Sequence, residues 1–263
     1  MRYLRLTAQF ARASAQNELA YRANFWVSLL HSLLNLITGV LGVWVIFGQV
    51  KSIRGWDLPS TLALLGVYLT LSALRDLFIG PSLEALAGMD GEIWRGTFDF
   101  ILLRPINVQF LASVRHWRPF ALVDLVLGLG VTAVAVAQLG QVLTPARLLS
   151  FLLALAAGAM ILYALLLAFS AWTLWSPGFL FTWVFDGLFR MARYPVGLYP
   201  GWLRLVLTWI VPVGVMTTIP AQALSGALSP WMLMGSMVLA VVFFTGASIL
   251  FRSGLRHYSS ASS

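Results

Sequence analysis

Long apolar runs separated by short polar segments make up most of the 263-residue chain. A helix that crosses a bilayer needs about 20 mainly apolar residues. Five runs reach that length and carry few or no charges. They are 25–48, 59–80, 119–143, 148–172 and 231–251. The pattern therefore predicts an all-α integral membrane protein.

The region between the last two of these runs is harder to interpret. It contains two more apolar runs, 179–194 and 202–220, interrupted by prolines. Arginines near both chain ends place both termini in the cytoplasm by the positive-inside rule. The number of crossings is then even, so we expect six transmembrane helices. One of the two runs does not cross.

Two arrangements of this region remain open from the residues alone. If 179–194 lies along the inner interface, the nearby arginines stay inside, as the positive-inside rule prefers. If 202–220 instead enters and leaves on the outer side, Pro212 explains why it is split into two pieces too short to span. The arginines concerned are Arg190, Arg193 and Arg204.

Residues 1–22 predict an amphipathic helix that lies in the membrane interface. Polar side chains recur at steps of three and four along one face, and apolar side chains occupy another. The charges also interrupt any continuous apolar core, so a cleavable signal peptide is not expected. A solvated start to the first span is the simpler alternative. The polar face consists of Arg2, Arg5, Gln9, Arg12 and Gln16.

Composition supports a membrane location and excludes several chemistries. Apolar residues make up 60% of the chain and charged residues 10%, with a mean hydropathy of +0.86, whereas soluble domains carry about 25% charged residues. The net charge of +8 comes almost wholly from arginine, since Lys51 is the only lysine. Arginines at the ends of apolar runs indicate membrane topology, not nucleic-acid binding. The absence of cysteine excludes disulfides and thiolate chemistry.

A few polar side chains lie within or beside the predicted spans. Asp186 and Arg190 are four residues apart with the acid first, which favours an ion pair on one helix. They either line a translocation path or form a structural pair that allows two costly charges to coexist in the membrane. We interpret Arg75 and Asp76 as structural and Asp124 as an anchor near Arg115 or Arg118. The three histidines are scattered, so no metal site is predicted.

The largest charged and amphipathic segment is 83–105, between the second and third spans, which the topology places in the cytoplasm. It predicts one or two short helices that end before Pro105, since the residue before a proline leaves helical geometry. Thr97 is a candidate cap for the second helix. The segment either merely connects two spans or is a docking site for a soluble partner.

This segment resembles the conserved cytoplasmic segment of type-2 ATP-binding-cassette (ABC) permeases, the membrane subunits of ABC exporters. The shared positions are Glu92, Gly96, Thr97, Asp99, Leu102, Leu103, Arg104, Pro105 and Ile106. A second match is similar to the proline-rich outer segment that this family places before its last span. It runs from Tyr194 and Pro195 through Pro200, Gly201, Trp202 and Arg204 to Pro212. Together the residues shared in the two matches suggest a small bacterial subgroup of this family.

The resemblance implies a fold and a role for these residues. It implies six spans, a coupling helix within 83–105, and a re-entrant hairpin at 200–225, which makes 179–194 the fifth span. The re-entrant segment then includes Pro195, Pro200, Trp202 and Pro212. The residues that contact an ATPase are Glu92, Trp94, Arg95, Gly96, Thr97, Phe98, Asp99, Leu103, Arg104 and Pro105. Within this set, Glu92 and Asp99 meet basic groups of the partner, while Trp94 and Phe98 are interface anchors.

The chain has no phosphate-binding loop of the Gly-x-x-x-x-Gly-Lys-Ser/Thr type, so it is not expected to hydrolyse ATP by that route. By resemblance, a separate ATP-binding subunit, present in two copies, binds ATP and magnesium. A second permease chain, identical or related, completes the membrane domain. We therefore expect a non-catalytic exporter subunit in a bacterial inner membrane that works by alternating access. No cofactor bound by this chain and no nucleic acid are expected.

Two other classes of protein compete with this interpretation. A membrane enzyme acting on lipid needs a cluster of reactive side chains at the interface, and none is evident in the sequence. An ion- or proton-coupled transporter without an ATPase needs internal repeats and mid-membrane charges, and only Asp186 and Arg190 come close. The substrate is not specified. The many aromatic residues suit a lipophilic or drug-like molecule, but they equally suit interfacial belts.

Overall fold

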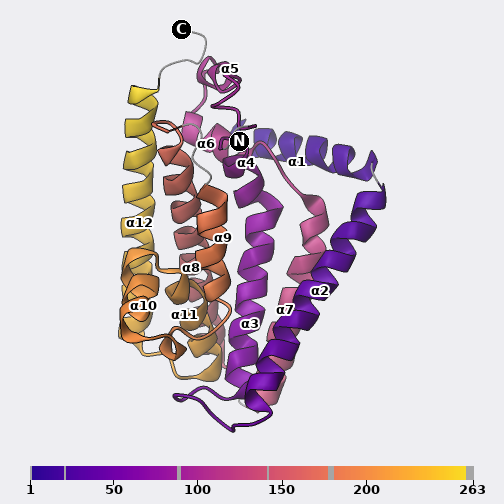
Figure 1. Cartoon of the computed structure of the whole chain (residues 1–263), viewed down its shortest axis with the longest axis vertical. Helices are drawn as coiled ribbons and strands as arrows, with labels where there is room; N and C mark the ends of the chain where they lie inside the picture. Colours follow the sequence, from indigo (N-terminus) through magenta and orange to yellow (C-terminus); the bar gives the residue numbers. More distant parts are fainter. Residues whose placement is uncertain (1, 21, 88–89, 141, 177–180, 259–263) are drawn as a thin grey trace.

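The computed structural model describes residues 2–20, 22–87, 90–140, 142–176 and 181–258 (Figure 1). These residues are helical and contain no strand, apart from an isolated bridge between Ile53 and Trp56. Five helices are long and apolar enough to cross a membrane. The all-α membrane class is therefore confirmed.

The five long helices are built from consecutive elements. They are α2 (Arg22–Phe47), α3 (Leu58–Leu74) continued by η1 (Arg75–Ile79) and α4 (Gly80–Glu84), η2 (Pro119–Ala121) with α7 (Leu122–Leu139), α8 (Pro145–Trp172), and α12 (Pro230–His257). Three of them begin with a polar cap next to a proline, an arrangement that satisfies free backbone N–H groups. The capping residues are Asp57, Thr144 and Ser229.

The bundle has a clear inside and outside. In α3 with its continuation and in α8, more than half of the most apolar stretch is buried, at 61% and 56%, against 17–22% in α2, α7 and α12. α3 packs mainly on α7, and α8 packs on α12 and α11 (Val213–Ser225). The outer helices therefore offer large apolar surfaces to lipid or to other chains.

Two glycines allow α3 and α7 to approach closely. A Cβ on Gly66 would lie 2.7 Å from the backbone N of Thr132, and a Cβ on Gly128 would lie 2.7 Å from the backbone N of Thr70. Each threonine hydroxyl donates to the carbonyl of the glycine four residues before it in its own helix, at 2.8 and 2.9 Å. This reciprocal Gly-x-x-x-Thr contact is a small-residue interface of the kind that stabilises membrane helices.

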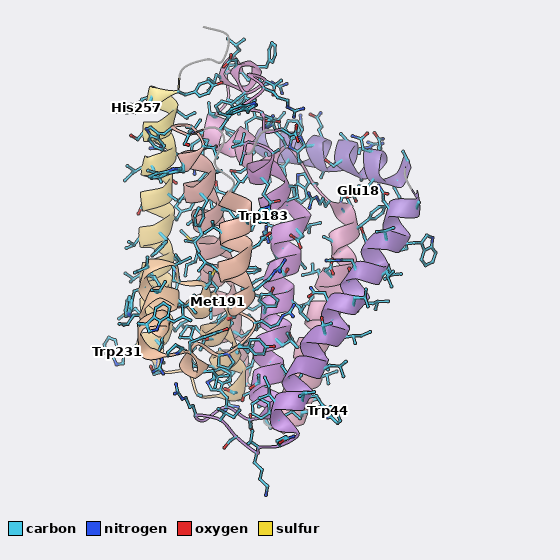
Figure 2. The ribbon with its side chains drawn as sticks, in the orientation of Figure 1. Glu18, Trp44, Trp183, Met191, Trp231 and His257 are labelled. Carbon is cyan, nitrogen blue, oxygen red and sulfur yellow. The ribbon has the colours of Figure 1, made fainter. Side chains whose placement is uncertain are left out.

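One end of the bundle carries the polar elements. There, α1 (Arg2–Ala20) runs across the ends of the spans, near α5 (Asp99–Leu102) and α6 (Val108–Val114) (Figure 1). Glu18 accepts a hydrogen bond from the backbone N of Phe120 at 3.0 Å, and Ser14 accepts one from that of Trp117 at 3.2 Å. These bonds fix α1 to the start of the third span. Trp44 and Trp231 lie toward the opposite end (Figure 2).

The predicted fifth span, 179–194, is shorter than expected. Helix α9 (Phe181–Met191) has eleven residues, about 16 Å, against a hydrocarbon core of about 30 Å. A turn follows at once and Pro195 ends the segment, so the described part of this helix is too short to span the hydrocarbon core by itself. Residues 179–180 lie outside the described residues.

The proline-rich region forms a bent pair of helices. The first part is α10 (Gly201–Leu205) with η4 (Val206–Ile210), and the second is α11, at 88° to it across Pro212. Length and composition allow this pair to be either a broken span or a re-entrant loop. A short element, η3 (Val196–Leu198), precedes it.

We predict that Gly128→Ala destabilises the protein by about 1–3 kcal/mol, because the added methyl group must push α3 away from α7. Gly130→Ala in the same helix is the matched control, since its Cβ would meet nothing within 4 Å. Thermal unfolding in detergent measures both variants. Equal stability of the two variants would contradict the close-contact interpretation.

Candidate functional site

The 83–105 segment folds back on itself at the α1 end of the bundle. Two backbone hydrogen bonds connect separate parts of this segment. Glu92 N donates to Ala85 O at 2.9 Å, and Phe98 N donates to Glu92 O at 3.1 Å. Gly96 has a φ of +71°, a left-handed conformation that glycine adopts without strain. Among the described residues, the segment is therefore a set of tight turns between the end of α4 and the short helix α5.

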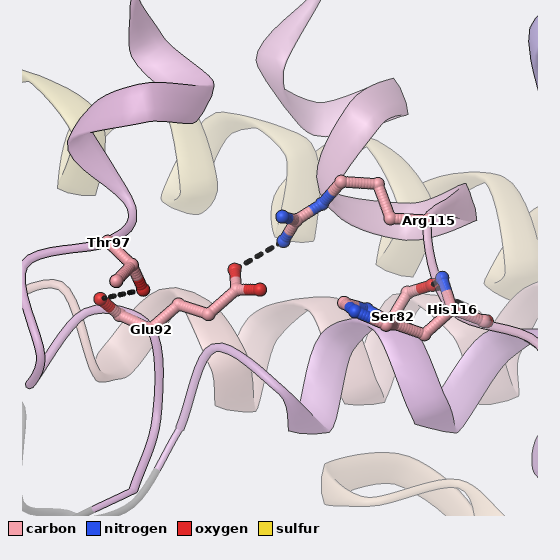
Figure 3. Close-up of polar contacts among 5 residues, drawn as sticks. All are labelled: Ser82, Glu92, Thr97, Arg115 and His116. Carbon is pink, nitrogen blue, oxygen red and sulfur yellow. Dashed lines mark hydrogen bonds and ion pairs between the residues drawn. The ribbon is translucent and has the colours of Figure 1, made fainter. Parts of the chain in front are cut away.

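An ion pair inside the chain holds this turn structure in place (Figure 3). The guanidinium of Arg115, just after α6, donates to the Glu92 carboxylate, and both side chains are largely buried. Thr97 Oγ1 donates to the backbone carbonyl of Glu92 at 3.3 Å. The Glu92 carboxylate is therefore already paired with Arg115 of the same chain, and its contact with a basic group of a partner stays a prediction. Thr97 does not cap α5, which has no side-chain cap.

A second link joins α4 to the residues after α6. Ser82 Oγ accepts a hydrogen bond from the backbone N of His116 at 2.8 Å and donates to its carbonyl at 3.0 Å. Burial lowers the pKa of His116 below its ordinary value, and the Arg115 cation lowers it further. A neutral imidazole is thus favoured beside the ion pair. Figure 3 shows both links side by side.

The apolar side of the segment packs into the protein itself. Ile93, Phe98 and Ile101 are buried, and the Phe98 ring makes an edge contact with Tyr258 just after α12, with 5.4 Å between centroids. Burial raises the pKa of the Tyr258 phenol to about 12, and the nearby Asp99 carboxylate adds to this shift. The prediction that Phe98 is an anchor for a partner is therefore wrong, because its ring is fully buried in this chain.

The opposite side of the segment is exposed and apolar with basic groups. Trp94 is 53% exposed, Phe100 68% and Leu103 80%. The sequence reasoning missed Phe100, although its position, two residues from the buried Phe98 and one from the buried Ile101, indicates the other face of the helix. Exposed neighbours from the predicted set are Arg95, Thr97, Arg104 and Pro105. We name Trp94, Phe100 and Leu103, with Arg95 and Arg104, the exposed face.

A separate polar cavity of about 310 Å³ lies among α2, α3 with η1, and α9. It holds both predicted path residues, Asp186 and Arg190. The other lining residues are His31, Asn35, Tyr68, Ser72, Arg75, Asp76, Phe189 and Arg193. The structure thus brings together polar groups from three helices that are distant in sequence.

Arg75 is the centre of the ion pairs at one end of this cavity. Its guanidinium lies 2.6 Å from a Glu84 oxygen and 2.7 Å from an Asp186 oxygen. The predicted pair of Asp186 with Arg190 is therefore wrong, because Asp186 turns toward α3 while Arg190 is exposed. Arg75 also begins the π-helical turn η1, a local irregularity that is frequent at functional sites.

Arg193 lies at the other end of the cavity. It donates to the Asn35 side-chain oxygen, and its guanidinium carbon lies 5.2 Å from the centre of the Tyr68 ring. Its Nε is buried without a hydrogen-bond partner among the described residues. Sequence reasoning did not select Arg193 for the path, although it continues the spacing of Trp183, Asp186 and Arg190 along one helical face.

The predicted re-entrant residues occupy the turns around α10 and α11. Pro195 and Pro200 directly precede η3 and α10, and Pro212 separates the two bent parts. Trp202 is 69% exposed. Each proline is therefore at an element boundary, where a missing N–H costs least.

Comparison with known proteins identifies the family. A family model described as ABC-2 family transporter protein matches residues 33–262, which is most of the chain. Searches of curated proteins and of solved structures found no match. The matched range includes the 83–105 segment, the polar cavity and the bent pair. The chain therefore belongs to the ABC-2 family, as a multi-pass membrane permease subunit of an ABC transporter.

Proposed function

We propose that this chain forms half of the membrane domain of an exporter and is driven by separate ATP-binding subunits that contact the 83–105 segment. The observation that carries the proposal is the exposed face, which presents Trp94, Phe100 and Leu103 at the α1 end of the bundle. Aromatic and basic side chains clustered on a rigid base are typical of protein interfaces. ATP and magnesium would be bound by the partner.

The contacts between this segment and the bundle are suited to transmit a movement of the ATP-binding subunit to the spans. Arg115 and Ser82 connect the segment to the residues before the third span and to α4, and Phe98 connects it to the end of α12. Glu84, at the start of the segment, pairs with Arg75, which in turn pairs with Asp186 on α9. Ion pairs therefore join the start of the proposed docking segment to the polar cavity.

We propose that α10 and α11 form a re-entrant hairpin and that the chain crosses the membrane around α9. Arg54, in the loop between α2 and α3, donates to the carbonyl of Gly197 before α10. Residues 226–230 after α11 share a cavity with Arg147 and Ser150 at the start of α8. Both ends of the bent pair thus lie near loops at the end of the bundle opposite α1, which supports six crossings.

We further propose that a second permease chain covers the cavity face of α2 and α9. Ionisable side chains at membrane depth face protein or water, not lipid, and Arg190 is exposed in the single chain. Two such chains and two ATPases would give alternating access at their interface. The arginine distribution favours a bacterial inner membrane with cytoplasmic α1 and α12 ends.

Leu103→Asp is expected to reduce recovery of the ATP-binding subunit with the tagged chain by about tenfold or more. Leu103 is 80% exposed, so the substitution leaves the fold intact. Val142→Asp is the matched control, because Val142 is 81% exposed near the opposite end. Both variants are purified from the native host by their affinity tag. The ATP hydrolysis activity of each purified complex then measures how much ATP-binding subunit is recovered. Transport that persists with no ATPase in the purified complex would favour a secondary transporter instead.

Trp183→Cys is expected to cross-link to a second membrane chain through a short bis-maleimide. The sequence has no cysteine, so this thiol is the only one in the chain. Val126→Cys, on α7 and 69% exposed, is the control on another surface. The mass of the adduct distinguishes an identical mate from a related one. Equal yields at both positions would refute a defined interface at α9.

A further inference from the structure

The two arginines at one end of the polar cavity have no acidic partner among the described residues. Arg193 bonds to the neutral amide of Asn35 and lies over Tyr68, and Arg190 is exposed. The acid that shares α9 with them, Asp186, pairs with Arg75. Two guanidinium groups therefore face the cavity with their charge uncompensated.

The cavity separates its charges along the helix axis. Tyr68, on α3, and Arg75, at the start of η1, are about two helical turns apart, about 10 Å, and the guanidinium of Arg193 lies over the Tyr68 ring. Asp76, which also lines the cavity, is beside Arg75 in sequence. The ion pairs of Arg75 therefore lie toward one end of the cavity, and the other, which we call the cationic end, holds Arg193 next to the neutral side chains of Asn35 and Tyr68.

The depth of the cationic end makes its charge costly. Asn35 lies near the middle of α2, and Arg193 bonds to it. An arginine near the middle of a bilayer costs about 2.5–3.5 kcal/mol on insertion scales. Such a residue is retained where it binds something, and guanidinium groups bind carboxylate and phosphate oxygens best.

We propose that Arg190 and Arg193 bind the anionic group of an amphiphile, so that the transported molecule carries a phosphate or carboxylate on an apolar body. The rings of Tyr68 and Phe189 line the same cavity as the two arginines. These side chains offer apolar contact beside the charges. The inference rests on the proposed transport function and names its substrate class.

The test measures binding to the purified chain in nanodiscs of neutral lipid, without any ATPase. The probes are decyl phosphate, decyltrimethylammonium and inorganic phosphate, read by tryptophan fluorescence and corrected with empty nanodiscs. We expect decyl phosphate to bind tightest. Arg190→Gln is expected to weaken its binding by about tenfold, the usual effect of losing one charge-assisted hydrogen bond.

Matched variants make the outcome decisive. Lys51→Gln removes one positive charge from the exposed α2–α3 loop and should leave binding unchanged. Arg193→Lys should bind decyl phosphate better than Arg193→Gln, because lysine keeps the positive charge. If Arg193→Gln fails to fold, the binding of decyl phosphate to Arg190→Gln decides the test. Unchanged binding in Arg190→Gln, or tighter binding of the cationic probe, overturns the proposal. Inorganic phosphate binding as tightly as decyl phosphate overturns the amphiphile assignment. ATPase association, tested by Leu103→Asp, fails or succeeds independently.

Discussion

The pairing of Arg75 with Glu84 and Asp186 is the interaction on which the arrangement of this protein depends. An ionisable side chain inside the membrane is costly and usually pairs with others or faces a polar cavity, and here the partners of Arg75 come from two different parts of the chain. One belongs to the 83–105 segment and the other to α9. The need to compensate one arginine therefore fixes the cytoplasmic segment and the short helix relative to α3.

The rest of the bundle is held by contacts of a different kind. Where α3 meets α7, the helices approach through Gly66 and Gly128, and packing replaces charge. Lipid tails are as apolar as leucine, so close contact and hydrogen bonding supply the stability. The α3–α7 pair is thus a rigid unit, and the polar side of α3 contacts α9. Helix α3 therefore has a close-packed interface with α7 on one side and polar contacts with α9 on the other.

Local sequence patterns predicted the long helices well, because hydropathy and helix caps depend on neighbouring residues. The partners of charged residues were not predictable in the same way. Glu92 pairs with Arg115 and Asp186 with Arg75, and only the folded chain brings these residues together. Trp94 and Phe98 were predicted as interface anchors, and Phe100, which is exposed next to the buried Ile101, was not. The length of α9 was overestimated because hydropathy does not detect the turn at residues 192–194, which ends the helix before Pro195.

The anchoring of α1 has a consequence for biosynthesis. Its hydrogen bonds join Glu18 and Ser14 to the backbone at Phe120 and Trp117, about a hundred residues later in the chain. During translation the first helix is made long before those donor amides exist. It must wait on the membrane surface until the third span has been inserted, because only then are the amides that it caps available. The N-terminal helix therefore reaches its final position only after the start of the third span has been made.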